Sequence, residues 1–209
     1  MEDFWNSLLT EKSWSLLIKI SKEPFKFIVI GGWATYLWTK LHKSKDIDIA
    51  ITDIRELDYL RRNYQLKKND NLKKYEISFD EIDLDIYVAY FSKLPIPVEH
   101  LSQFTTKIEG LNVLKPEALL ILKQGAELQR KESTKGAKDQ IDIMALLFYS
   151  NINTNLYFDL LKKYNLENYF LRLKSVINSF KDYNYLNLNP RQFKLKKKEI
   201  LGKLTKTFK

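Results

Sequence analysis

The sequence predicts an α+β fold, in which a mixed β-sheet flanked by helices is followed by a bundle of helices. The prediction rests on a change in the spacing of apolar residues along the chain. Short apolar runs and alternating segments, typical of strands, occupy the part before Pro95, whereas apolar residues at helical spacing follow Pro97. We place the boundary near residue 114, which gives an α/β domain over 1–114 and a helical domain over 115–209.

The first domain is predicted to alternate helices and strands. Phe25–Ile30 is a short apolar run closed by Gly31-Gly32, which indicates a buried strand. Residues 46–51 alternate Asp and Ile, which gives a strand one acidic and one apolar face. The remaining predicted elements of this domain are helices at 3–21, 33–41 and 53–62 and strands at 64–67, 72–79 and 82–90.

The second domain is predicted to be helical throughout. Pro116 suits the first turn of a helix that runs to about Arg130. Further helices are expected at 138–149, across 153–183, and in a basic segment that follows Asn189-Pro190.

Composition limits the chemistry that the chain can perform. It has 209 residues, with 35 Lys and Arg against 26 Asp and Glu, no Cys and two His. The lack of Cys excludes disulfides, thiolate zinc sites and a Cys nucleophile, and two histidines are too few for a His-rich metal site. No apolar run approaches the roughly 20 residues of a membrane span, and the N-terminus is acidic where a signal peptide is basic. We therefore expect a cytoplasmic protein.

The formal charge of +9 is concentrated near the C-terminus. The segment 191–209 carries eight basic residues and one acid, which is +7 of that total. Apolar residues interleave these charges, so we expect part of the segment to pack on the protein as a basic helix. Such a helix would contact RNA phosphates in a salt-sensitive way. The alternative is a solvated terminal tail.

Two acidic strands carry the most informative pattern. Asp46 and Asp48 stand two positions apart on a predicted strand, so both carboxylates project from one face. Paired carboxylates repel each other unless a cation lies between them, and oxygen ligands suit Mg²⁺. A later strand offers Asp83 and Asp85 at the same spacing, and a third carboxylate would complete a site for one or two Mg²⁺ ions. Such sites stabilise phosphoryl or nucleotidyl displacement.

Gly31 and Gly32 stand between a predicted strand and a predicted helix. Glycine lets a phosphate approach the backbone amides, and the N-terminal end of a helix favours negative charge, so both are candidate nucleotide-binding residues. The alternative is that the glycines only form a turn, with Asp46 and Asp48 on the solvent face of an edge strand. The two motifs together, with a second acidic strand downstream, favour a site.

At this spacing, Gly31-Gly32, Asp46-x-Asp48 and a later strand acid resemble the signature of the polymerase-β-type nucleotidyltransferases, over about residues 25–90. The resemblance implies a nucleotidyltransferase-type sheet that binds Mg²⁺ and a nucleoside triphosphate such as ATP. The superfamily usually has Gly-Ser where this chain has Gly-Gly, which removes a hydroxyl donor. The sequence Gly-Gly-Trp-Ala is similar to the AbiE toxin-like branch and to the aminoglycoside or lincosamide nucleotidyltransferase-like branch.

The resemblance also implies roles for individual carboxylates. Asp46 and Asp48 match the catalytic, metal-binding pair of the superfamily. Asp85 is our choice for the third catalytic and metal-binding acid, with Asp83 as second choice because both point to the same face.

Charged residues of the second domain resemble a pattern of the AbiE-like branch. Lys123 lies in an otherwise apolar helix, where an unpaired charge is costly, and Arg130 and Lys138 follow. We expect these three cations to bind the triphosphate, and Asp142, three residues after Asp139, to orient Lys123 or Arg130. The alternative is an internal salt-bridge cluster that ties two helices together.

Three functions agree with these motifs. The first is a nucleotidyltransferase that modifies RNA (tRNA) or a protein, and the AbiE-like resemblance implies a toxin paired with an antitoxin protein. The second is a small-molecule nucleotidyltransferase acting on an antibiotic-type hydroxyl, although the helical domain lacks the acidic cluster that a cationic substrate would need. The third is a non-catalytic nucleic-acid-binding module, against which the intact Asp46, Asp48 and Asp85 argue. We expect the first.

Overall fold

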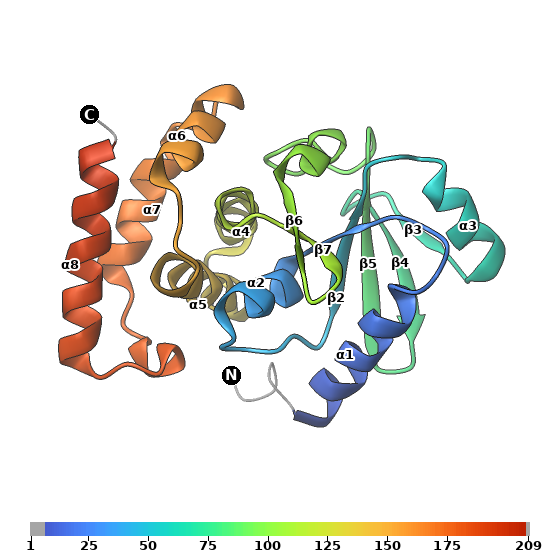
Figure 1. Cartoon of the computed structure of the whole chain (residues 1–209), viewed down its shortest axis with the longest axis horizontal. Helices are drawn as coiled ribbons and strands as arrows, with labels where there is room; N and C mark the ends of the chain where they lie inside the picture. The colour runs from blue at the N-terminus through green and yellow to red at the C-terminus, as the bar shows by residue number, and fades with distance from the viewer. Residues whose placement is uncertain (1–6, 208–209) are drawn as a thin grey trace. The chain divides into compact units, whose positions relative to one another are not determined.

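The computed structural model describes residues 7–207, and Figure 1 shows the course of the chain through them. These residues divide into two compact units, one ending at Lys115 and the other beginning at Pro116. The described part of the first unit contains a mixed sheet with flanking helices, and that of the second contains helices alone. The predicted α+β fold class is therefore confirmed.

Within the described part of the first unit, seven strands form one sheet in the order β3-β4-β5-β2-β1-β7-β6. The strands are β1 (Ile28–Ile30), β2 (Ile47–Ile51), β3 (Lys67–Asn69), β4 (Lys74–Phe79), β5 (Ile82–Val88), β6 (Thr105–Ile108) and β7 (Leu111–Leu114). β2 runs parallel to β5 and β1 runs parallel to β7, whereas the other neighbours are antiparallel. The acidic strands β2 and β5 are thus adjacent at the middle of the sheet.

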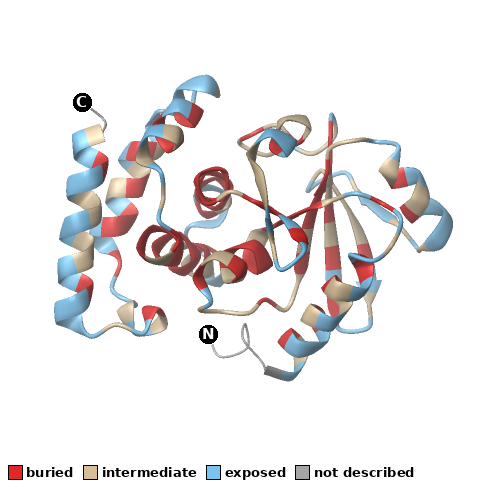
Figure 2. Ribbon diagram, viewed as in Figure 1, coloured by how far each residue is buried: buried red, intermediate tan, exposed pale blue. Residues whose placement is uncertain are grey.

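Three α-helices accompany this sheet: α1 (Ser7–Ile20), α2 (Gly31–Thr39) and α3 (Glu56–Asn63). The side chain of Trp33, at the start of α2, is fully buried and donates a hydrogen bond from Nε1 to Oγ of Ser13 on α1, at 2.9 Å. The apolar residues of β1 and β2 are buried as well (Figure 2). Residues 3–6 of the first predicted helix lie outside the described residues.

The sequence-based prediction is wrong directly after the prolines. A 3₁₀ helix, η2 (Val98–Phe104), leads into a β6–β7 hairpin, where helical spacing was expected to begin. The hairpin turn places Glu109 and Gly110 at positive φ, 51° and 82°, the conformation that two-residue hairpin turns require. Strand β3 also begins at Lys67, where the predicted strand was to end, and continues into the predicted turn.

The second unit consists, over its described residues, of α4 (Pro116–Arg130), α5 (Thr134–Tyr149), α6 (Thr154–Lys163), α7 (Asn168–Ser179), the 3₁₀ helix η3 (Tyr183–Leu186) and α8 (Pro190–Thr207). Most residues of α4 and α5 are buried, whereas α8 exposes most of its surface and buries Phe193 and Leu204 (Figure 2). The basic segment is therefore a helix packed on its unit, at least as far as Thr207. No helix within residues 7–207 combines the length and the apolar character needed to cross a bilayer.

Candidate active site

Three carboxylates form a row across neighbouring strands. Asp48 on β2 pairs in register with Asp85 on β5, and Asp85 pairs with Glu76 on β4. Side chains of directly paired residues lie on the same face of a sheet, so the three acids stand side by side. The apolar residues that alternate with them, such as Ile47 and Leu84, are buried on the other face. We call Asp48, Asp85 and Glu76 the carboxylate row.

Asp48 lies directly against the glycine motif. Gly31 has a φ of +64°, and a Cβ atom built on it would lie 2.0 Å from Oδ2 of Asp48. Only glycine fits at this position, both because of the backbone conformation and because the carboxylate fills the space. Gly31 also begins α2, whose N-cap residue Ile30 makes no side-chain capping hydrogen bond. The N-terminus of α2 therefore brings backbone N–H groups, and the positive end of its dipole, close to this carboxylate.

One cation lies within the row. Nζ of Lys74, on β4, is 2.6 Å from Oδ2 of Asp85 and 3.0 Å from Oε1 of Glu76. Glu76 also accepts a hydrogen bond from Nδ2 of Asn69, at 3.1 Å. The side chains of Lys74, Asp85 and Glu76 are only 12%, 17% and 29% exposed, so water screens these charges weakly.

The surroundings change the ionisation of Asp85. Burial, together with the nearby charge of Asp48, raises the pKa of Asp85 to about 6, although Lys74 acts in the opposite direction. Burial acts to lower the pKa of Lys74, but its hydrogen bonds and attraction to Asp85 and Glu76 outweigh burial and raise that pKa. An ionised Asp85 next to Asp48 is thus costly, and an additional cation at this place would relieve the cost.

The other predicted residues of this unit lie around the row. Asp46 is half-buried in the bend one residue before β2. Asp83, our second choice, is exposed on β5 and accepts a hydrogen bond from Oγ of Ser78, at 3.0 Å. Gly32 is buried in the first turn of α2. Glu76 and Lys74 were not predicted. The alternation of polar and apolar residues on their strand was visible, but only the strand pairing brings them to Asp85.

The chemistry of this donor set fits a hard divalent cation. Within residues 7–207, no group of three His, Cys, Asp or Glu side chains is arranged to hold a metal ion on its own. Mg²⁺, however, commonly takes one or two protein carboxylates and completes its shell with water and substrate phosphates. Asp48 and Asp85 provide such a pair, because they are paired in register on the neighbouring strands β2 and β5.

In the helical unit, the predicted nucleotide-binding residues lie in an ion-pair cluster. Nζ of Lys123 is 2.6 Å from Oδ2 of Asp142 and 3.5 Å from Oδ1 of Asp139. Arg130 donates to both carboxylate oxygens of Asp139, from Nε at 2.7 Å and from a terminal nitrogen at 3.1 Å. Lys138 is half-buried next to Asp139 on α5. We call Lys123, Arg130, Asp139 and Asp142 the α4–α5 cluster.

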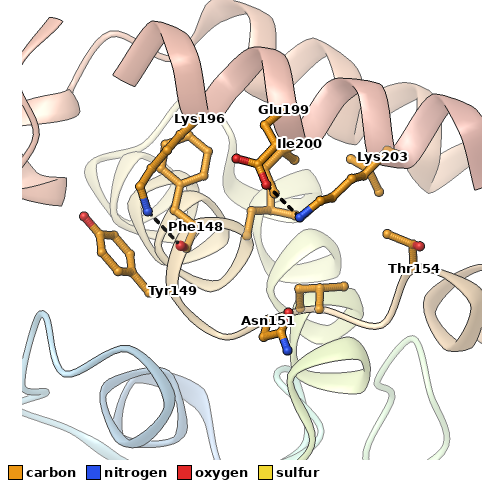
Figure 3. Close-up of a pocket in the computed structure, with 11 residues that line it drawn as sticks. Phe148, Tyr149, Asn151, Thr154, Lys196, Glu199, Ile200 and Lys203 are labelled. Atoms are coloured by element: carbon orange, nitrogen blue, oxygen red, sulfur yellow. Dashed lines mark hydrogen bonds and ion pairs between the residues drawn. The ribbon is translucent and has the colours of Figure 1, made fainter. Parts of the chain in front are cut away.

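The helical unit also contains a cavity of about 240 Å³ between α8 and the end of α5 (Figure 3). Lys196 points to the end of α5, where its Nζ donates to the carbonyl oxygen of Phe148 at 3.2 Å and lies 4.5 Å from the ring centre of Tyr149. Lys203 pairs with Glu199 on the same helix at 2.7 Å. Both lysines thus bind groups of the helical unit itself, and the cavity is not the candidate active site.

Comparisons with known proteins bear on the fold. No protein-family model and no curated protein sequence matches the chain. Among solved structures, the chain is similar to JHP933 from Helicobacter pylori, with a TM-score of 0.50 and 17% identity over 95% of this chain and 93% of that chain. The fold is nucleotidyltransferase-like.

Two further structures show weaker similarity. One is an antigenic nucleotidyltransferase-like protein from Paracoccidioides brasiliensis, with a TM-score of 0.42 and 18% identity over 80% of this chain and 91% of that chain. The other is the antibiotic-resistance factor ANT(2'')-Ia, with a TM-score of 0.48 and 14% identity over 81% and 95%. At these identities the similarity concerns the fold, and the function has to be argued from the site.

Proposed function

We propose that the chain is a Mg²⁺-dependent nucleotidyltransferase that moves a nucleoside monophosphate from a nucleoside triphosphate to a hydroxyl acceptor. The observation that carries the proposal is the in-register pair Asp48 and Asp85, with Asp48 seated on Gly31 at the N-terminus of α2. Two carboxylates on rigid neighbouring strands, beside a helix N-terminus that suits phosphate, are the parts that metal-assisted transfer to a hydroxyl needs.

Each residue has a distinct role in this proposal. Asp48 and Asp85 would hold Mg²⁺, with Asp46 close by in the chain as the other member of the predicted pair. The ion supplies charge neutralisation at the phosphates and orients them. The amides at the start of α2 bind phosphate oxygens next to Gly31 and Gly32. Asp85 takes the proton of the acceptor hydroxyl. The acceptor oxygen then bonds to the α-phosphorus, and pyrophosphate leaves.

Lys123, Arg130, Lys138 and Asp142 stay in the proposal as nucleotide-binding residues of the helical unit. The positive charge of Lys123, Arg130 and Lys138 suits a triphosphate, and Asp142 would orient Lys123. The ion pairs of Lys123 and Arg130 with Asp139 and Asp142 equally suit an internal cluster. The free energy of unfolding and the triphosphate affinity of Lys123 variants distinguish the two roles.

RNA is the acceptor that we propose. Arg191, Lys194 and Lys198 are exposed on α8 at spacings of three and four residues, so they share one helix face. A line of cations on a helix suits the phosphates of an RNA strand. The AbiE-like resemblance adds a toxin role with an antitoxin protein as partner, and a gene for a small protein next to this one would support it.

The experiment is a transfer assay with each labelled triphosphate, Mg²⁺ and total tRNA or cell extract. We expect Asp48→Asn and Asp85→Asn to fold and to lose transfer, because a neutral amide is a poor Mg²⁺ ligand. Asp83→Asn, on the exposed part of the same strand, is the matched control and should keep activity. Label that reaches RNA supports the proposed acceptor. Wild-type transfer by Asp48→Asn, or in excess chelator, would contradict the metal-dependent mechanism.

A further inference from the structure

Lys74 is a cation in contact with two members of the carboxylate row, Asp85 and Glu76, and the proposed function gives it no role. Its Nζ lies between Asp85 and Glu76, at 2.6 Å and 3.0 Å, and its side chain is 12% exposed. Lys74 and Glu76 stand two positions apart on β4, so both side chains lie on the face of the row.

The position of the ammonium creates a conflict with a bound metal ion. Lys74 binds Oδ2 of Asp85, the carboxylate that would hold Mg²⁺ together with Asp48. Two cations that share one carboxylate in a weakly screened place repel each other strongly. The three carboxylates outnumber the cations beside them, which are Lys74 and the exposed Lys67 that pairs with Glu76 across the strands. A divalent ion at Asp85 therefore competes with Lys74.

Glu76 reduces the cost of that competition. It is already within hydrogen-bond distance of Lys74, pairs with Asp85 across the strands, and is held by Asn69. When the ammonium leaves Asp85, it keeps a carboxylate partner, so the large penalty for an unpaired buried charge does not arise. The move is a short one, because both carboxylates contact the same nitrogen.

We propose that Lys74 is a positioning residue that holds Asp85 in the metal-free protein and shifts to Glu76 when a divalent ion binds Asp48 and Asp85. The inference rests on the proposed function, because it takes these two carboxylates as the metal ligands. Lys74 thereby orients Asp85 in the absence of metal, and sets how tightly the site binds metal before the nucleotide arrives.

The test measures Mn²⁺ binding to the nucleotide-free protein from the loss of the free-ion signal in electron paramagnetic resonance. We expect Lys74→Met to bind Mn²⁺ about tenfold more tightly than the wild type, since one competing charge-assisted hydrogen bond is removed. Lys74→Gln serves as a second variant if Lys74→Met does not fold. Lys107→Met is the matched control, because Lys107 is exposed on β6 and its loss changes the net charge equally. Equal affinities of the Lys74 and Lys107 variants would overturn the proposal.

A double variant tests the role of Glu76. Glu76→Gln should weaken Mn²⁺ binding severalfold in the wild-type background, because the displaced ammonium then has no carboxylate, and should have no effect in the Lys74→Met background. A loss in both backgrounds would mean that Glu76 binds the metal itself, which overturns its proposed role.

Asp48→Asn distinguishes failure of this inference from failure of the proposed function. If Asp48→Asn abolishes Mn²⁺ binding while Lys74→Met changes nothing, only the role of Lys74 is wrong. If Mn²⁺ binds the wild type and Asp48→Asn equally, the metal site of the proposed function is itself wrong.

Discussion

The sheet unit and the helical unit both gather charged side chains, most of them poorly exposed, but they balance the charges differently. In the α4–α5 cluster, two cations, Lys123 and Arg130, face two carboxylates. In the carboxylate row, three acids face Lys74, and the only other cation paired with the row across the described strands is the exposed Lys67 next to Glu76. The first group is neutral and the second carries an excess of negative charge.

This difference indicates which group needs a ligand. Poorly exposed charges are tolerated when each has a partner, and an excess of one sign is costly. The α4–α5 cluster is complete without a bound molecule, whereas the carboxylate row is relieved by an added cation. The pKa of Asp85, raised to about 6, expresses the same cost. The excess of negative charge therefore supports the sheet as the place for the proposed metal site. The presence of charged residues in the α4–α5 cluster gives no such support.

The largest effect on metal binding and transfer is expected from Gly31→Ala, which tests whether the carboxylates of the sheet unit form the metal site. The added Cβ would lie 2.0 Å from Oδ2 of Asp48 at a φ of +64°, so the carboxylate has to move. We expect Mn²⁺ binding and nucleotidyl transfer to fall by about 100-fold or more, because small misplacements of catalytic groups have effects of that size.

Gly110→Ala is the control for Gly31→Ala. Gly110 also has a positive φ, +82°, but nothing lies within 4 Å of its Cβ position. This variant carries backbone strain of about 1 kcal/mol without the collision and should keep activity. If both variants lose activity equally, crowding at Asp48 is not the cause.

The second prediction concerns the α4–α5 cluster. Lys123→Met leaves Asp142, whose side chain is 4% exposed, without its closest cation. We expect the free energy of unfolding to fall by about 4 kcal/mol, typical of breaking a buried pair. Combining Lys123→Met with Asp142→Leu should restore most of the lost free energy of unfolding, because no unpaired carboxylate is then left at position 142. Lys203→Met, which breaks the exposed pair with Glu199, should cost no more than about 0.5 kcal/mol. Chemical denaturation of the wild type and the three variants measures these changes.

Triphosphate affinity of the same variants decides the function of Lys123. A purely structural cluster predicts that the double variant binds the triphosphate as the wild type does. If Lys123 contacts the triphosphate, triphosphate affinity stays low in the double variant although stability returns. The α4–α5 cluster would then be a ligand-binding site, contrary to the contrast drawn between the two units.

Much of the fold follows from the sequence because its local signals agree. The start of α4 at Pro116 and the strand before Gly31 were predictable from residue patterns. The β6–β7 hairpin was missed because its strands have four residues each, too few to establish a period. Its Glu109-Gly110 turn was the available signal, since glycine after a polar residue favours a two-residue hairpin.

The site was predictable only where it depends on local sequence. The alternation in β2 and β5 placed Asp48 and Asp85 on strand faces, but periodicity does not determine which strands pair. Lys74 and Glu76 reach Asp85 through the register of β4 and β5, which no local pattern specifies. The sequence did not determine the ion-pair partners of Lys123 for the same reason, because these pairs depend on how α4 packs on α5.

The third prediction sharpens the claim that ionising Asp85 is costly. The pKa of Asp85 is raised from 3.8 to about 6, mainly by burial and then by Asp48. Folding thus favours protonated Asp85: this contribution to stability is fully present below pH 4 and is lost as the pH rises through 6. In excess chelator, we expect the stability of Asp85→Asn relative to the wild type to increase by about 3 kcal/mol between pH 4 and pH 7.

Repeating the comparison of Asp85→Asn with its parent in the Asp48→Asn background tests what raises the pKa of Asp85. Without the charge of Asp48, the change with pH should shrink but persist, since burial is the larger cause. A difference between Asp85→Asn and the wild type that is constant from pH 4 to pH 7 would mean that Asp85 ionises at no extra cost, and the contrast between the two units would fail.

The smallest effect is expected for tRNA binding by α8, whose exposed cations lie outside the α4–α5 cluster. Changing the exposed Arg191, Lys194 and Lys198 to Gln should weaken tRNA binding about 30-fold at 0.15 M salt and reduce the salt dependence by about 2, since each lost phosphate contact accounts for about 0.7 of the slope. Filter binding at several salt concentrations measures both quantities.

The matched control for α8 removes the same charge from the sheet unit, by changing the exposed Lys22, Lys93 and Lys107 to Gln. If this variant loses as much tRNA affinity as the α8 variant, the interaction depends on net charge alone and α8 has no special role. If only the α8 variant is affected while its Mn²⁺ affinity stays that of the wild type, the two units divide the work. The sheet then supplies the negative charge that binds metal, and α8 supplies the positive charge that binds the acceptor.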